Sequence, residues 1–214
     1  MLIFTIVGAR LGHCLFYEPG YYFSNPIKFL YVWEGGLASH GGAIGILIGL
    51  YIYAKKIDKP YIWILDRIVV PVAIGVAFIR TGNLMNSEIY GQPTDLPWGF
   101  KFVRDYPIGT PIENIPACHP TQIYEALFCV AVFIYLLYAY YKQNMAERRP
   151  GFMFGIFLIV VFGSRILIEF IKNHQVAFED NMVLDMGQWL SIPFLLAGIY
   201  FVVRSFLKTE KLKN

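Results

Sequence analysis

Long apolar segments separated by short polar connections constrain this chain more than any other feature. A helix needs roughly 20 apolar residues to cross a hydrocarbon core about 30 Å thick. Five segments meet that requirement, residues 37–54, 61–79, 122–141, 152–171 and 186–207, and a sixth, residues 1–17, is only just long enough. The pattern predicts an all-α, polytopic helical membrane protein with six visible transmembrane helices, in which residues 1–214 form a single membrane domain.

Composition excludes most other classes of protein. The chain is 57% hydrophobic and 15% charged, whereas soluble domains carry about a quarter charged residues. A net charge of +3 does not indicate a nucleic-acid partner. Cys14, Cys118 and Cys129 show neither paired nor metal-ligand spacing, so we expect no disulfide framework and no zinc site.

The distribution of basic residues predicts the orientation in the membrane. Lysine and arginine mark cytoplasmic loops, and they concentrate in residues 55–59, 142–149 and 204–213. We therefore expect these loops and the C-terminus in the cytoplasm. The longer connections should face outward. One of them, residues 82–120, contains six prolines and is expected to be an irregular periplasmic arm or head.

Charged residues inside the predicted spans need an explanation, because each costs roughly 3 kcal/mol at the centre of a membrane helix. Arg165 and Glu169 are four residues apart, hence on one helical face. Either they form an ion pair that only makes insertion tolerable, or Arg165 meets a substrate and Glu169 positions it. Arg80 has no acid at that spacing, and Glu88 is its nearest candidate partner. Arg10 is a further charge within the first segment.

Residues 80–91 combine an arginine, two asparagines, a glutamate and two glycines at a predicted membrane boundary. The planar guanidinium of Arg80 suits phosphate oxygens, and asparagine amides both donate and accept hydrogen bonds. The segment therefore either surrounds a lipid headgroup or is a capped helix end followed by an ordinary polar turn.

Two histidines stand where predicted spans begin. His40 is either structural or a group that takes a proton from a thiol or alcohol. Residues 119–125 contain helix-start chemistry, but His119, Gln122 and Glu125 can equally line the mouth of a cavity. The row Gly41, Gly45 and Gly49 predicts close packing of helices.

These motifs, in this order, resemble the prolipoprotein diacylglyceryl transferase family from about residue 7 to residue 201. The matching segments are residues 8–12, 33–36, 39–42, 80–91, 119–125, 163–170 and 187–193. Residues 80–91 look like the family signature G-R-x-G-N-x-x-N-x-E-x-x-G, with Ile79 in place of the first glycine. The family pattern has seven spans, so we expect a first helix, carrying a functionally important tyrosine, to be missing ahead of Met1.

The resemblance implies a multi-pass enzyme of the bacterial inner membrane. Such an enzyme moves the diacylglyceryl group of phosphatidylglycerol to the thiol of the lipobox cysteine in a prolipoprotein signal peptide. It forms a thioether and releases glycerol 1-phosphate, the first step of lipoprotein maturation. The implied partners are phosphatidylglycerol, membrane lipids and prolipoprotein signal peptides, with no nucleic acid. No metal or organic cofactor is implied.

The resemblance also implies roles for individual residues. Arg80 and Arg165 would bind the phosphate, and His40 would be the base or proton shuttle, so these three are the expected catalytic residues. The expected substrate-binding residues are Asn83, Asn86, Glu88, Gly91, Glu169, His119, Gln122, Tyr124 and Glu125. An enzyme cysteine as nucleophile is disfavoured, because no cysteine lies in a matched motif and the substrate brings its own thiol.

Two other functions compete with the transferase. A transporter or channel would use Arg10, Arg80, Arg165 and His40 along a pathway, since intramembrane charges suit that role. Against it, no inverted repeat is visible and the polar residues gather toward the outer face. A packing scaffold would explain the glycine row but leaves residues 80–91 without a purpose.

Overall fold

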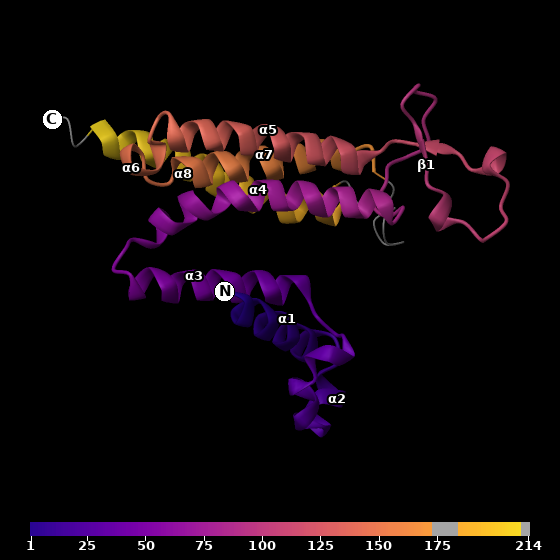
Figure 1. Ribbon diagram of the computed structural model, residues 1–214, viewed down its shortest axis with the longest axis horizontal. Coiled ribbons are helices and arrows are strands. Elements are labelled where there is room, and N and C mark those ends of the chain that lie inside the picture. The colour runs from indigo at the N-terminus through magenta and orange to yellow at the C-terminus, as the bar shows by residue number, and fades with distance from the viewer. Residues whose placement is uncertain (173–183, 211–214) are drawn as a thin grey trace. The chain divides into compact units, whose positions relative to one another are not determined.

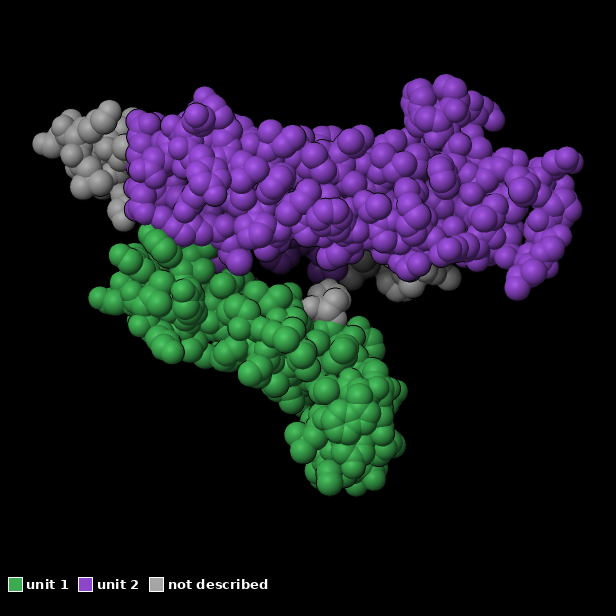
Figure 2. Space-filling view, viewed as in Figure 1, with its two compact units in different colours: residues 1–64 green, residues 65–214 purple. Residues whose placement is uncertain are grey.

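The computed structural model describes residues 1–172 and 184–210, apart from a few side chains within these ranges. Nearly all of the regular structure is helical (Figure 1), as predicted. The chain forms two compact units, Met1–Ile64 and Leu65–Asn214 (Figure 2), and each is described by itself. The single membrane domain expected over residues 1–214 stays a prediction.

Close contact between two helices organises the first unit. Its elements are α1 (Leu2–Phe16), α2 (Pro19–Ser24), the 3-10 helices η1 (Pro26–Leu30) and η2 (Val32–Glu34), and α3 (Ser39–Lys56). A Cβ added to Gly41 of α3 would collide with the carbonyl of Gly8 and lie 2.8 Å from the Cα of Gly12 in α1. The helices can approach this closely only because side chains are absent here, which confirms the packing role predicted for the glycine row.

Arg10 of α1 has a structural partner set within the first unit. Its side chain is almost fully buried, and its guanidinium donates to the carbonyls of Lys28 at 2.6 Å and Gly36 at 3.2 Å, and to that of Gly35. Carbonyl groups outside regular helices need such partners when water is scarce. Arg10 therefore fastens the irregular connection after α2 onto α1.

The second unit contains the helices long and apolar enough to cross a membrane. They belong to α4 (Tyr61–Met85), α5 (Thr121–Tyr141), α7 (Phe152–Glu169) and α8 (Met186–Glu210), while α6 (Met145–Arg148) is short. Within the described residues these four helices qualify by length and composition, and they make the chain a multi-pass membrane protein. The other two predicted spans correspond to α1, with only 15 residues, and to α3, whose 18 residues include Lys55 and Lys56.

The core of this unit joins α4, α5 and α7. Val69 of α4, Leu136 of α5 and Met153 of α7 are buried in one apolar cluster. Helix α8 packs along α7, where Phe162 and Phe194 stack with ring centroids 4.5 Å apart. This packing fixes the positions of α4, α5 and α7 relative to one another, and these three helices supply the polar site described below.

A buried carboxylate ties α4 to the start of α7. Asp66 is fully buried and accepts hydrogen bonds from the backbone N–H groups of Gly151 at 2.6 Å and Phe154 at 2.9 Å. Gly151 is the N-cap of α7 and Phe154 lies in its first turn, where backbone N–H groups have no acceptor within the helix. Asp66 therefore caps α7 from a neighbouring helix.

The proline-rich segment forms an arm between α4 and α5. It holds a two-stranded antiparallel sheet of β1 (Phe100–Lys101) and β2 (Ala117–Cys118), and the 3-10 helices η3 (Val103–Asp105) and η4 (Ile112–Asn114). Helix α4 runs to Met85, three residues beyond the expected start of the arm at residue 82. The periplasmic placement of the arm stays a prediction.

Candidate functional site

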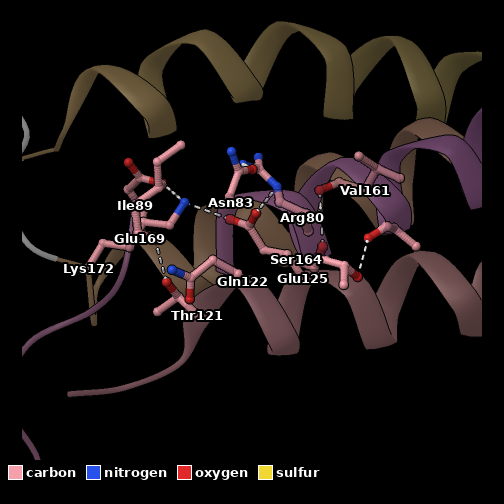
Figure 3. Close-up of polar contacts among 12 residues, drawn as sticks. Arg80, Asn83, Ile89, Thr121, Gln122, Glu125, Val161, Ser164, Glu169 and Lys172 are labelled. Atoms are coloured by element: carbon pink, nitrogen blue, oxygen red, sulfur yellow. Dashed lines mark hydrogen bonds and ion pairs between the residues drawn. The ribbon is translucent and has the colours of Figure 1, made fainter. Parts of the chain in front are cut away.

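Charged side chains from three helices meet at the arm end of the second unit. Helix α4 ends there, α5 begins there, and α7 ends there, so Arg80, Glu125 and Glu169 face one another although they are far apart in the sequence (Figure 3). We call Arg80, Glu125, Arg165, Glu169 and Lys172 the charged cluster.

Glu125 is the centre of the charged cluster. Its carboxylate pairs with Nε of Arg80 through one oxygen and with Nζ of Lys172, at 2.6 Å, through the other. Lys172 also lies 3.4 Å from a carboxylate oxygen of Glu169. The side chain of Lys172 is 3% exposed and that of Glu125 is 7% exposed. Charges this deeply buried are tolerable only when paired, which explains the continuous chain of ion pairs.

Arg165 is the exception in this chain of ion pairs. Its Nε is buried and has no hydrogen-bond partner among the described residues. The residue lines a cavity of about 180 Å³ together with Arg80, Glu125, Cys129 and Ser164. A buried donor without a partner is costly unless something else satisfies it. This cavity is therefore the place where the cluster can accept an anionic ligand.

The structure corrects two predicted pairings. The alternative in which Arg165 and Glu169 form an ion pair is wrong for the described residues, because Glu169 pairs with Lys172 at the end of α7. Arg80 pairs directly with Glu125 rather than with Glu88. Sequence spacing pointed to partners nearby in the chain, whereas the actual partner of Arg80 comes from another helix.

Residues 80–91 form a connected hydrogen-bond chain around Arg80. Asn83 accepts from Nη1 of Arg80 at 3.4 Å and donates to the carboxylate of Glu88 at 2.7 Å. Asn86 donates to the same carboxylate oxygen of Glu88 at 3.5 Å. An ordinary polar turn after the helix end at Met85 would not need these hydrogen bonds, which connect the side chains of the turn to the guanidinium of Arg80.

The turn that follows is strained and is held from α5. Ser87 and Ile89 have φ values of 57° and 61°, a conformation that costs on the order of 1–3 kcal/mol for such residues. Thr121 donates to the carbonyl of Ile89 at 2.9 Å (Figure 3), and Gln122 donates to that of Glu88 at 2.6 Å. The first turn of α5 thus compensates the strain and fixes the segment beside Arg80.

Three further predicted residues connect the arm to the helices. The hydroxyl of Tyr124 lies 3.3 Å from Nδ1 of His119 and accepts a hydrogen bond from Nε1 of Trp98 at 2.9 Å. The N–H of Gly91 donates to the carbonyl of His119 at 2.9 Å, and a Cβ on Gly91 would lie 2.8 Å from that of His119. Their predicted part in substrate binding remains untested by these contacts, which hold the arm in place.

Most of the predicted site residues lie together in the second unit, and His40 is not among them. His40 belongs to the first unit, and its side chain lies outside the described residues. Lys172 is the member that sequence reasoning missed, because it belongs to none of the motifs considered there. Its spacing of three residues from Glu169, a distance that brings side chains together on a helix, was the available signal.

The charge balance decides what this site can do. Three cations, Arg80, Arg165 and Lys172, face two carboxylates, Glu125 and Glu169, which leaves an excess of one positive charge. Arginine is suited to phosphate because its guanidinium donates in a planar fork. The fold and the site together define a multi-pass membrane protein with a buried cluster of side chains that carries an excess of positive charge.

Comparison with known proteins places this class in a family. A family model described as prolipoprotein diacylglyceryl transferase matches residues 1–204, and the chain belongs to that family. A phosphatidylglycerol–prolipoprotein diacylglyceryl transferase of Porphyromonas gingivalis is 51% identical over 207 residues, covering 94% of this chain and 73% of the relative. Proteins of the same name from Tolumonas auensis and Chloroherpeton thalassium are 44% and 43% identical, covering 96% and 98% of this chain and 76% and 75% of the relatives.

Proposed function

We propose that this protein transfers the diacylglyceryl group of phosphatidylglycerol to the cysteine thiol of a prolipoprotein lipobox. The family match and the names of the relatives support this reaction. They do not point to a transporter. The observation that carries the proposal is the cationic cavity, which Arg80 and Arg165 both line and beside which the buried Nε of Arg165 has no hydrogen-bond partner among the described residues.

The bonding changes set what the charged cluster must do. The cysteine sulfur forms a bond to the glyceryl carbon that carries the phosphate, and the bond from that carbon to the phosphate oxygen breaks. The bonding electrons stay on the oxygen, so glycerol 1-phosphate leaves with more negative charge than the phosphodiester had. Arg80 and Arg165 stabilise this growing charge, which is the largest contribution that a preorganised site can make.

The other residues prepare this step. Glu125 holds Nε of Arg80, and Asn83 accepts from its Nη1, so the guanidinium is oriented before the lipid arrives. The thiol proton goes to a base, and His40 is the residue that we assign to it, because imidazole titrates near neutral pH. Asn86 and Glu88 contact the headgroup at the end of the hydrogen-bond chain.

The same proposal includes the cellular setting. The protein lies in the bacterial inner membrane with the charged cluster toward the periplasm, and its basic loops and C-terminus face the cytoplasm. The segment after α4 then meets the signal peptide where it emerges from the membrane. Membrane lipids surround the apolar faces of α4, α5, α7 and α8.

Reconstituted protein supplied with labelled phosphatidylglycerol and a lipobox peptide tests the proposal. We expect diacylglyceryl-thioether peptide and released glycerol phosphate. Arg80→Ala and Arg165→Ala should each lower the rate about 100-fold or more, the effect of removing one donor to a developing anion.

Arg67→Ala is the matched control. Arg67 is also an arginine of α4, but it pairs with Glu147 at 2.5 Å instead of joining the charged cluster. This variant should transfer at close to the wild-type rate. Wild-type turnover in both Arg80→Ala and Arg165→Ala would refute the phosphate-binding roles.

A further inference from the structure

Gln122, which lines a second cavity together with Arg80, also has an unsatisfied buried atom. Gln122 is 1% exposed, and its Nε2 donates to the carbonyl of Glu88 at 2.6 Å. A carbonyl can only accept, so this bond fixes which end of the amide is nitrogen. The remaining atom, Oε1, is buried and has no hydrogen-bond partner among the described residues.

Gln122 lines a cavity distinct from the one that contains Arg165. This cavity has a volume of about 200 Å³ and lies between α4 and α5. Besides Gln122, its polar lining comes from Arg80 and Thr81, and its other lining residues are Leu84, Ile123, Ala126, Leu127 and Val130. Arg80 lines both cavities, so a ligand held by this guanidinium reaches the surroundings of Gln122.

Of the three buried side-chain atoms without a partner among the described residues, the two that belong to these cavity-lining residues are complementary, and the third is Oε1 of Gln143. Arg165 offers an unused donor and Gln122 an unused acceptor, with Arg80 between the two cavities that they line. A ligand that satisfies both carries an anionic acceptor group and, next to it, a hydrogen-bond donor. Because the cluster already has an excess of positive charge, an ammonium donor is disfavoured and a neutral hydroxyl is favoured.

We propose that Oε1 of Gln122 accepts a hydrogen bond from a hydroxyl of the lipid headgroup and thereby selects lipids whose phosphate carries an alcohol-bearing group. The assignment rests on the proposed function and specifies its lipid substrate. Gln122 is then a specificity-determining residue. Its Nε2 stabilises the strained turn at Ser87 and Ile89 by donating to the carbonyl between them, while its Oε1 accepts from the headgroup hydroxyl.

The selection follows from the cost of leaving the acceptor unpaired. A lipid without the hydroxyl would bury Oε1 against apolar atoms, and sites built around a hydrogen bond discriminate strongly against analogues that lack it. The test compares phosphatidylglycerol with phosphatidylpropanol of the same acyl chains. The two lipids have the same phosphodiester charge, and phosphatidylpropanol has no headgroup hydroxyl.

We expect wild-type protein to prefer phosphatidylglycerol by about 100-fold in kcat/KM, the size of effect expected when one buried acceptor is left unpaired. In Gln122→Met the preference should fall by about tenfold or more, because the thioether cannot replace the acceptor, while Asn86 and Glu88 still contact the headgroup. The ratio of the two lipids in one preparation corrects for any loss of folded protein. Gln122→Leu is a second variant of similar size should the methionine variant fail to fold.

Thr121→Val is the matched control. Thr121 is the neighbouring residue of α5 and makes the companion bond to the strained turn, to the carbonyl of Ile89 at 2.9 Å. Its loss should slow both lipids alike and leave the preference intact. Equal use of both lipids by wild-type protein, or an unchanged preference in Gln122→Met, would overturn the assignment. Absence of product from either lipid with wild-type protein would instead contradict the proposed function on which it rests.

Discussion

At the scale of single residues, the site depends on buried cations and on the carboxylates that pair with them. Lys172 is buried more deeply than either arginine of the charged cluster, and it bridges Glu125 and Glu169. Its backbone also forms a bridge with Gly91, so the end of α7 is joined to the end of the Arg80 segment. Under the proposed function, we therefore expect Lys172 to be a positioning residue that acts on the phosphate through Glu125 and Arg80.

Lys172→Met tests this positioning role. Without the ammonium, Glu125 neutralises Arg80 alone and the excess positive charge of the cluster is lost. We expect KM for phosphatidylglycerol to rise about tenfold, and the variant to lose about 3 kcal/mol of stability, since one partner of a buried ion pair is removed. Steady-state kinetics and unfolding in detergent measure the two effects.

Lys172→Arg should restore most of the lost lipid affinity, because it restores the charge. Lys101→Met, a change of an exposed lysine in the arm, should leave KM near the wild-type value. A Lys172→Met protein with unchanged KM would show that Lys172 does not act on the lipid site.

The three cysteines are the second prediction at this scale. All are buried, and burial raises the pKa of the Cys118 thiol in the arm, which makes its thiolate scarce at neutral pH. Cys129 lines the cationic cavity and is the one to test with most care. Replacing all three with alanine should leave most of the transfer activity in the assay with labelled lipid. A folded triple variant that no longer transfers would mean that an enzyme cysteine takes part.

At the scale of elements, contacts between helices set how the helices pack and where α7 begins, which local sequence preference alone does not determine. Helix α3 lies against α1 through glycines, and α7 is capped by Asp66 from α4. The glycine spacing was readable from the sequence because small residues every fourth position form one helical face. The role of Asp66 was not readable, since its partners lie more than 80 residues further along the chain.

Gly41→Ala tests the contact between α1 and α3. The added methyl group would meet the backbone at Gly8 and Gly12, and we expect a loss of about 1–3 kcal/mol from overpacking. Gly75→Ala in α4 is the control, because a Cβ there meets nothing within 4 Å, and alanine favours the helix by about 1 kcal/mol. Unfolding in detergent should separate the two variants. Equal stability of both would contradict the close packing.

At the scale of the whole molecule, the sequence predicted the helical class and the spans of the second unit, because both follow from hydropathy, which is a local property. The assignment of Arg80, Asn83 and Glu125 to one site came from the family resemblance. The ion-pair partners could not be predicted, because Arg80 and Glu125 meet only after α4 and α5 pack. The two weaker predicted spans, residues 1–17 and 37–54, correspond to α1 and α3. Helix α1 has only 15 residues and α3 ends in two lysines, so neither matches the four long apolar helices of the second unit in length and composition.

The central claim is that the protein joins a diacylglyceryl group to a lipobox thiol at a cationic site that includes Arg165. Mass spectrometry of the peptide and the released phosphate compound, after one incubation with phosphatidylglycerol, tests it most directly. We predict one thioether-linked diacylglyceryl peptide for each glycerol phosphate with wild-type protein, and almost none of either with Arg165→Ala. Unmodified peptide with wild-type protein, or equal product with and without the Arg165 guanidinium, would contradict the claim.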